Sequence, residues 1–171
     1  TVARLKKGRR VEELEQFALN DSMTGMYNRN AYDYFVKNEK DFEGYVIVTF
    51  DLNNLKQCND QYGHRAGDEY IINAAHIIED NFERYGKCYR IGGDEFCCII
   101  PKGRYFKIER VMHKIDQDVE ILNHKNIIPV PVGIAYGYAV FTADDTDPEK
   151  VRERADEDMY LSLIHISEPT R

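Results

Sequence analysis

The chain of 171 residues contains no tryptophan and only four cysteines, and its cysteines follow neither of two common functional patterns. The spacing of Cys58, Cys88, Cys97 and Cys98 fits neither a zinc ribbon nor a thioredoxin-like pair. Cys97 and Cys98 also stand inside an apolar run. We therefore interpret all four as small buried residues in a reducing cytosol.

Long apolar runs and an excess of basic residues are also missing. No stretch is long enough to cross a bilayer and no signal-peptide pattern is present. We therefore expect a cytoplasmic segment without membrane contact, in a full-length protein that can be anchored through a missing N-terminal region. The 23 Lys and Arg residues face 30 Asp and Glu residues, a net charge of −7, which argues against a nucleic-acid partner. A phosphate ligand would need a divalent cation to neutralise much of its charge.

A length of 171 residues suffices for one domain with a helical extension. Hydrophobic residues make up 43% of the chain, enough to support a core. Because predicted strands and helices alternate but a hairpin interrupts them, we expect an α+β fold with a mixed or antiparallel sheet and helices packed on it. The hydrophobic periods predict helices at residues 5–20, 28–40, 66–82, 108–122 and 148–160, and strands at 45–50 and 131–141.

The most informative segment is YRIGGDEF at residues 89–96. Two β-prone runs joined by Gly92 and Gly93 predict a tight hairpin. Glycine lets a backbone approach a ligand closely, and Asp94 and Glu95 follow at once. A turn that combines bare backbone with two carboxylates suits a metal-bound polyphosphate. A solvated hairpin is the alternative that this segment alone leaves open.

A third acidic residue, Asp51, ends the strand predicted at residues 45–50. If that strand neighbours the hairpin, Asp51 and Asp94 meet at one edge of the sheet and offer hard oxygen ligands to Mg²⁺. Farther along, the amide of Asn59 and the carboxylate of Asp68 could together read a guanine edge. Each residue alone could equally be a turn residue or a helix cap.

Four sequence blocks occur in an order typical of one family. They are DSMTGMYNR at residues 21–29, FDLNNLK at 50–56 followed by ND, GH and GD up to residue 68, GGDEF at 92–96, and RAD with MY at 154–160. In these blocks the chain resembles the GGDEF domain of bacterial diguanylate cyclases. The resemblance implies a ferredoxin-like fold of the nucleotidyl-cyclase and polymerase-palm type. It also implies condensation of two GTP into cyclic di-GMP with release of two pyrophosphates.

The resemblance further implies roles for single residues. Asp51, Asp94 and the carbonyl of Leu52 would hold Mg²⁺ or Mn²⁺. Lys56 would stabilise developing charge, and Asp94, with Glu95 as the alternative, would assist deprotonation of the 3′-hydroxyl.

Substrate contacts follow from the same resemblance. Each domain would bind one GTP, so a homodimer would be needed to form both bonds. The expected substrate-binding residues are Asn54 and Leu55 at the phosphates, Asn59 and Asp68 at the guanine, and Gly92 and Gly93 as the close-approach surface.

The chain also departs from the family pattern. Glu83 and Gly86 occupy the positions of the Arg and Asp of an inhibitory product-feedback motif, which we therefore expect to be absent. Leu163 and Ser167 stand where the family has a phosphate-binding Lys and Arg. Residues 161–171 resemble the translation of a transposase sequencing adapter, so we interpret them as a non-native tail.

These features divide the chain into three expected parts. Residues 1–20 would be a linker or signalling helix, either the end of a coiled coil or a solvated helix, below an upstream sensor domain. Residues 21–160 would be the cyclase domain, incomplete at its C-terminus. Without the Lys and Arg we expect weak or no activity from residues 1–171. A catalytically inactive GTP-binding regulatory domain is the alternative function.

Overall fold

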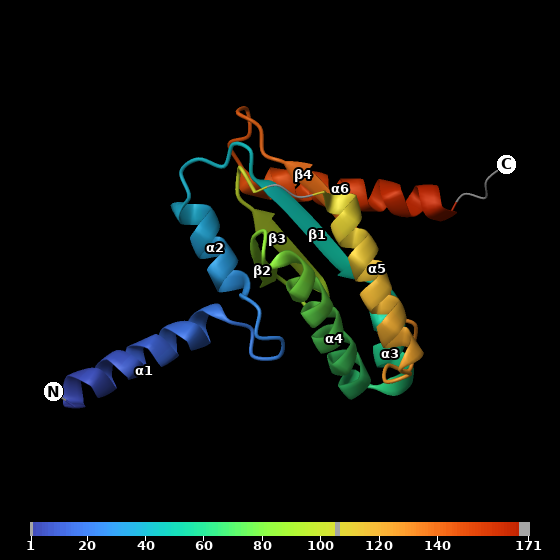
Figure 1. The fold of residues 1–171 in the computed structure, drawn as a ribbon, viewed down its shortest axis with the longest axis horizontal. Coiled ribbons are helices and arrows are strands. Elements are labelled where there is room, and N and C mark those ends of the chain that lie inside the picture. Colours follow the sequence, from blue (N-terminus) through green and yellow to red (C-terminus); the bar gives the residue numbers. More distant parts are fainter. Residues whose placement is uncertain (1, 105–106, 168–171) are drawn as a thin grey trace.

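The computed structural model describes residues 2–104 and 107–167. Within this part the chain forms an antiparallel sheet of four strands in the order β2-β3-β1-β4 (Figure 1). This order, with helices after β1 and β3, is the ferredoxin-like arrangement, so the predicted α+β class is confirmed. The strands are β1 (Val46–Leu52), β2 (Lys87–Arg90), β3 (Glu95–Ile100) and β4 (Ile134–Val140).

Helices cover both faces of this sheet. One face carries α4 (His64–Phe82) and α5 (Ile108–His124), with α3 (Leu55–Tyr62) packed against α4. The opposite face carries α2 (Arg29–Asn38) and α6 (Pro148–Ser167). The remaining helix, α1 (Val2–Leu19), projects away from the sheet (Figure 1). None of the helices in residues 2–104 and 107–167 is both long and apolar enough to traverse a bilayer.

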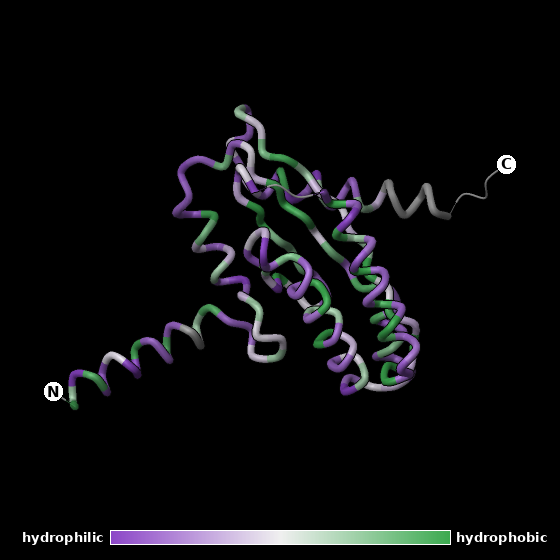
Figure 2. Tube along the Cα trace, viewed as in Figure 1, coloured by the Kyte–Doolittle hydropathy of each residue, from purple (hydrophilic) through white to green (hydrophobic). Residues whose placement is uncertain are grey.

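The two covered faces explain the nearly continuous apolar sequence of β1. Val48 and Phe50 point into the core under α4 and α5, whereas Ile47 points to α2 and α6. The ring of Phe50 meets Phe82 of α4 edge-on at 5.3 Å between centroids. Burying each such side chain contributes about 1.5–3 kcal/mol. Figure 2 shows hydrophobic residues along the strands, while α1 alternates between hydrophilic and hydrophobic residues.

Helix α3 is the main difference from the expected elements. The polar segment between residues 53 and 68 shows no helical period because only Leu55 and Cys58 of α3 are buried. The helix is bounded by two residues with positive φ, Asn54 (63°) and Gly63 (86°). The other predicted elements are confirmed, with ends shifted by a few residues and with α6 continuing beyond residue 160 to Ser167.

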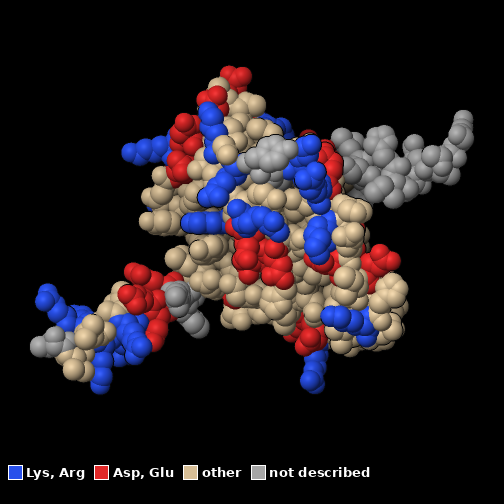
Figure 3. Space-filling model, viewed as in Figure 1, with Lys and Arg blue, Asp and Glu red and all other residues tan. Residues whose placement is uncertain are grey.

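The charges on the surface agree with the mixed composition. On the face shown in Figure 3, acidic side chains of the described residues gather over α4 next to a band of basic ones. Opposite charges therefore lie side by side on this face.

Candidate active site

The sheet brings three predicted acidic residues to one edge. Asp51 of β1 lies directly opposite Glu95 of β3 in the antiparallel register, and Asp94 immediately precedes β3. The fold therefore brings Asp51 next to the hairpin, as predicted. Asp51 is half-buried, and its Oδ1 accepts a hydrogen bond from the Leu52 N–H at 2.9 Å.

Burial and the neighbouring carboxylates perturb the ionisation of Asp51. Burial raises the pKa of Asp51, the negative charge of Asp94 raises it further, and the Leu52 N–H offsets part of the shift. A cation between the two carboxylates would remove this repulsion. Within the described residues, no group of three or more His, Cys, Asp or Glu side chains forms a ready metal cage. Mg²⁺ commonly takes one or two carboxylates and completes its shell with water and phosphate oxygens, so the pair fits as a donor set.

The turn between β2 and β3 differs in detail from the expected tight hairpin. Residues 91–94 connect the strands, with the Ile91 N–H bonded to the Glu95 carbonyl at 2.9 Å. Neither Gly92 nor Gly93 has a positive φ, so the turn does not require glycine for its backbone conformation. A Cβ at Gly93 would have no heavy atom of the described residues within 4 Å. Gly93 therefore leaves open space beside the carboxylates, whereas a Cβ at Gly92 would lie 3.2 Å from Glu95 Oε2.

A cavity of about 420 Å³ adjoins these acids on the face covered by α6. Its sheet side includes Thr49, whose buried Oγ1 has no hydrogen-bond partner in the described residues. Its helix side is formed by Arg152, Asp156 and Met159. Arg152 had no predicted role. Its spacing from Asp156 and Met159, four and seven residues along a predicted helix, is the signal that could have placed all three on one face.

The loop after β1 ends in an exposed helix N-terminus. Asn54 adopts the left-handed conformation, and its side chain makes no capping hydrogen bond within the described part of the chain. The first N–H groups of α3, at Leu55 and Lys56, therefore lack partners within the helix. Such N–H groups, together with the helix dipole, attract phosphate.

A buried tyrosine fixes this loop in place. The Tyr70 hydroxyl donates to the Asn53 carbonyl at 2.6 Å and accepts from the Gly133 N–H at 2.9 Å. Tyr70 is fully buried, and burial raises its pKa to about 12. The sequence indicated only that Tyr70 belongs to the apolar face of a helix. Its hydroxyl contacts depend on Asn53 and Gly133, which are distant along the chain.

Of the two residues predicted to bind guanine, Asn59 lies against Gly67, the residue that precedes Asp68. Asn59 of α3 rests on the α4 backbone, where a Cβ at Gly67 would lie 1.8 Å from the Asn59 Oδ1. Asp68 is the next residue and is exposed. Gly67 thus permits the close approach of α3 and α4 that joins this pair. Lys56 lies one turn before Asn59 on α3 and is also exposed.

An arginine links the first sequence block to the turn between β2 and β3. Arg90 Nη1 lies 3.1 Å from Asp21 Oδ2, and Arg90 Nη2 donates to the Gly93 carbonyl at 3.0 Å. Asp21 also accepts from the N–H and the hydroxyl of Thr24. Although burial acts to raise the pKa of Asp21, the hydrogen bonds from Thr24 and Arg90 lower it overall. The carboxylate is therefore held ionised beside Arg90.

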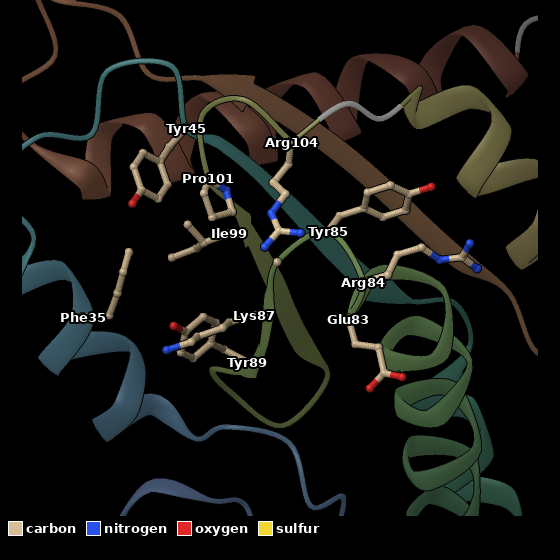
Figure 4. A pocket seen from close by; sticks show the side chains of 11 residues that line it. Phe35, Tyr45, Glu83, Arg84, Tyr85, Lys87, Tyr89, Ile99, Pro101 and Arg104 are labelled. Carbon is tan, nitrogen blue, oxygen red and sulfur yellow. The ribbon is translucent and has the colours of Figure 1, made fainter.

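Glu83 and Gly86, at the two positions of the feedback motif that we expect to be absent, line a second cavity of about 260 Å³ (Figure 4). The guanidinium of Arg104 points among the labelled side chains, while the Glu83 carboxylate lies at the edge of the group. A Cβ at Gly86 would lie 2.1 Å from the Ile99 carbonyl oxygen. An aspartate at this position would therefore require a backbone shift.

The expected tail lies partly outside the described residues. The helix α6 continues through residues 161–167, and residues 168–171 lie beyond the described part. The interpretation of residues 161–171 as non-native, and the roles given to the missing Lys and Arg, stay predictions.

Comparison with known proteins agrees with this arrangement. A family model described as "Diguanylate cyclase, GGDEF domain" matches residues 18–163. The bifunctional diguanylate cyclase/cyclic di-GMP phosphodiesterase MucR of Pseudomonas aeruginosa is 30% identical over 157 residues, which cover 86% of this chain and 22% of MucR. The diguanylate cyclase DgcS of Shewanella oneidensis is 28% identical over 155 residues, covering 87% of this chain and 51% of DgcS. The chain thus spans from about a fifth to about half of the length of these relatives.

A solved structure shares the same fold. The coiled coil and GGDEF domain of DgcB from Caulobacter crescentus, determined in complex with c-di-GMP, superposes with a TM-score of 0.77. The alignment covers 96% of this chain and 91% of the DgcB chain at 24% identity.

Proposed function

This chain belongs to the GGDEF family of diguanylate cyclases, and we propose that it condenses two GTP into cyclic di-GMP with release of two pyrophosphates. The observation that carries the proposal is the closeness of Asp51 and Asp94 at one end of the sheet, where β1 leads into the uncapped N-terminus of α3. Carboxylates that suit a cation and N–H groups that suit phosphate are the two requirements of a metal–triphosphate site.

The residues after β1 would bind and orient the substrate. The N–H groups of Asn54 and Leu55, together with that of Lys56, would receive phosphate oxygens, and the Tyr70 hydroxyl keeps their loop in one position. Asn59 and Asp68 offer an amide and a carboxylate side by side for the guanine edge. Phosphoryl transfer depends mainly on such positioning and on charge stabilisation.

Asp51, Asp94 and the Leu52 carbonyl would hold Mg²⁺ or Mn²⁺. The bound cation would polarise a phosphoryl oxygen and lower the pKa of the attacking hydroxyl. Asp94, with Glu95 as the alternative, would accept the proton of the 3′-hydroxyl. Lys56 would stabilise the charge that develops on the phosphate oxygens.

The complete reaction would need two copies of the domain. One domain binds one GTP, and the product contains two phosphodiester bonds, so each copy would supply one half. The relatives that the chain matches are longer than the chain itself. We therefore propose that a longer, full-length protein forms the homodimer and carries an upstream sensor domain.

Turnover of GTP tests the proposal directly. The protein is incubated with GTP and Mg²⁺, and nucleotides are separated by chromatography. Two forms are compared: residues 1–171, and a form in which residues 161–171 are replaced by a segment with the family's Lys and Arg. We expect cyclic di-GMP from the second form and little from the first. GTP bound by the second form without turnover would contradict the proposal and favour the regulatory alternative.

A further inference from the structure

Two thiols face each other across the hairpin that carries the GGDEF segment. Cys88 of β2 and Cys98 of β3 are cross-strand partners in the antiparallel register. The Cys98 thiol contacts the Cys88 Sγ at 2.8 Å. Both residues are buried, with 3% and 0% of their surface exposed, and all four cysteines are free thiols.

The register places this pair at the position that suits a disulfide. The Ile91 N–H bonds to the Glu95 carbonyl, so residues 91 and 95 form a hydrogen-bonded pair. Because such pairs alternate along an antiparallel ladder, Cys88 and Cys98 form a non-hydrogen-bonded pair, whose Cα atoms are about 4.5 Å apart. A disulfide requires Cα atoms about 4.4–6.8 Å apart. Strands β2 and β3 therefore need little movement to be joined.

The other two cysteines do not share this arrangement. Cys97 neighbours Cys98 in sequence but points to the opposite face of the sheet, where it packs in the core under α2 and α6. Cys58 lies on α3 and is buried in the core beside α4. Among the cysteines of the described residues, only Cys88 and Cys98 have their sulfur atoms in contact.

We propose that Cys88 and Cys98 form a reversible disulfide that fastens β2 to β3 when the protein meets a disulfide oxidant. The closed ring would run from residue 88 to residue 98 and would contain the whole segment Gly92–Phe96. In a reducing compartment the pair stays as two thiols.

The chemistry is an ordinary thiol–disulfide exchange. The thiolate of Cys88, the slightly more exposed residue, attacks one sulfur of glutathione disulfide and releases one glutathione thiolate. The thiolate of Cys98 then attacks the Cys88 sulfur and releases the second. Two electrons pass from the protein to the oxidant, and the two thiol protons end on the two glutathiones.

Burial governs the rate of this step. It raises the pKa of Cys98 well above its usual range, so the Cys98 thiolate that makes the second attack is scarce while the hairpin is closed. We therefore expect slow oxidation of the native protein and faster oxidation when the hairpin opens during refolding.

The test counts and maps thiols after oxidation. Reduced protein is treated with glutathione disulfide in the native state and, separately, during refolding from urea. Free thiols are blocked with N-ethylmaleimide, and peptides are identified by mass spectrometry without reduction. We expect loss of two of the four thiols and a peptide pair joined through Cys88 and Cys98. The joined protein should melt about 5 °C higher than the reduced protein, since the ring restricts the unfolded chain.

Matched variants separate this pair from the other thiols. Cys97→Ser should still lose two thiols, whereas Cys98→Ser should lose none to an internal disulfide and should show no rise in Tm on oxidation. Four blocked thiols in the wild-type protein after oxidative refolding would overturn the proposal. A wild-type peptide map with Cys58 or Cys97 in the crosslink would also overturn it, and this readout does not depend on any variant folding.

Discussion

The turn and the strands of the β2–β3 hairpin are adjacent in sequence but have opposite environments. At the turn, Gly93 and Glu95, the first residue of β3, are exposed, and burial together with the charge of Asp94 raises the pKa of Asp51. In the strands, Phe96 and Cys98 are buried and belong to the core under α4 and α5. The proposed chemistry thus lies at the turn, where the carboxylates of Asp51 and Asp94 repel each other. The buried residues of β3 that follow the turn hold it in position. Changes on the two sides should therefore affect different properties.

The largest expected effect is on catalysis in the turn. Asp94→Ala, in the form with the restored C-terminal segment, should lower cyclic di-GMP formation by at least ~10²-fold because it removes a metal ligand and a proton acceptor. Its Tm should not fall, since the change also removes repulsion with Asp51. Initial rates and thermal melts measure both. Glu120→Gln, at an exposed position on α5, is the control and should leave both unchanged. Activity retained in Asp94→Ala would show that the metal assignment is wrong.

The second effect is on stability and concerns Phe96, two residues after Asp94. Phe96 is 1% exposed, so Phe96→Ala should lower the free energy of unfolding by about 3–5 kcal/mol through lost contacts and a cavity. Urea unfolding followed by circular dichroism measures this loss. A loss below about 1 kcal/mol would contradict the division between turn and strands.

The smallest effect is a pH dependence. The folded protein raises the pKa of Asp51, so ionisation of Asp51 destabilises the fold, and this cost appears as pH rises through that pKa. Asp51→Asn should therefore raise the Tm by about 2 °C at pH 7. The gain should disappear below the ordinary carboxyl value of 3.8, where Asp51 is protonated in both states. Melts from pH 3 to pH 7 test the sign, and a gain that grows toward low pH would contradict it.

The sequence predicted the elements whose signals are local. The apolar run of β1 and the helical periods of α4 and α5 match the structure, and a hairpin forms at Gly92 and Gly93, although its connection is longer than expected. Helix α3 was not predicted because its only two buried residues, Leu55 and Cys58, are too few to reveal a period.

The predicted acidic residues came from motifs, whereas other parts of the site depend on tertiary contacts. Tyr70 looks like an ordinary apolar position until the fold brings Asn53 and Gly133 to its hydroxyl. Arg152 likewise joins the cavity only because α6 packs against β4 and β1. No short sequence window contains either arrangement.

The bridge made by Arg90 has a mechanical consequence. A single guanidinium holds Asp21, which comes just after α1, and the Gly93 carbonyl of the turn. A rotation of α1 that shifts Asp21 must therefore either carry Gly93 with it or break these hydrogen bonds. The angle at which α1 enters the domain is thus coupled to the position of the carboxylates through one side chain, without any change in the sheet.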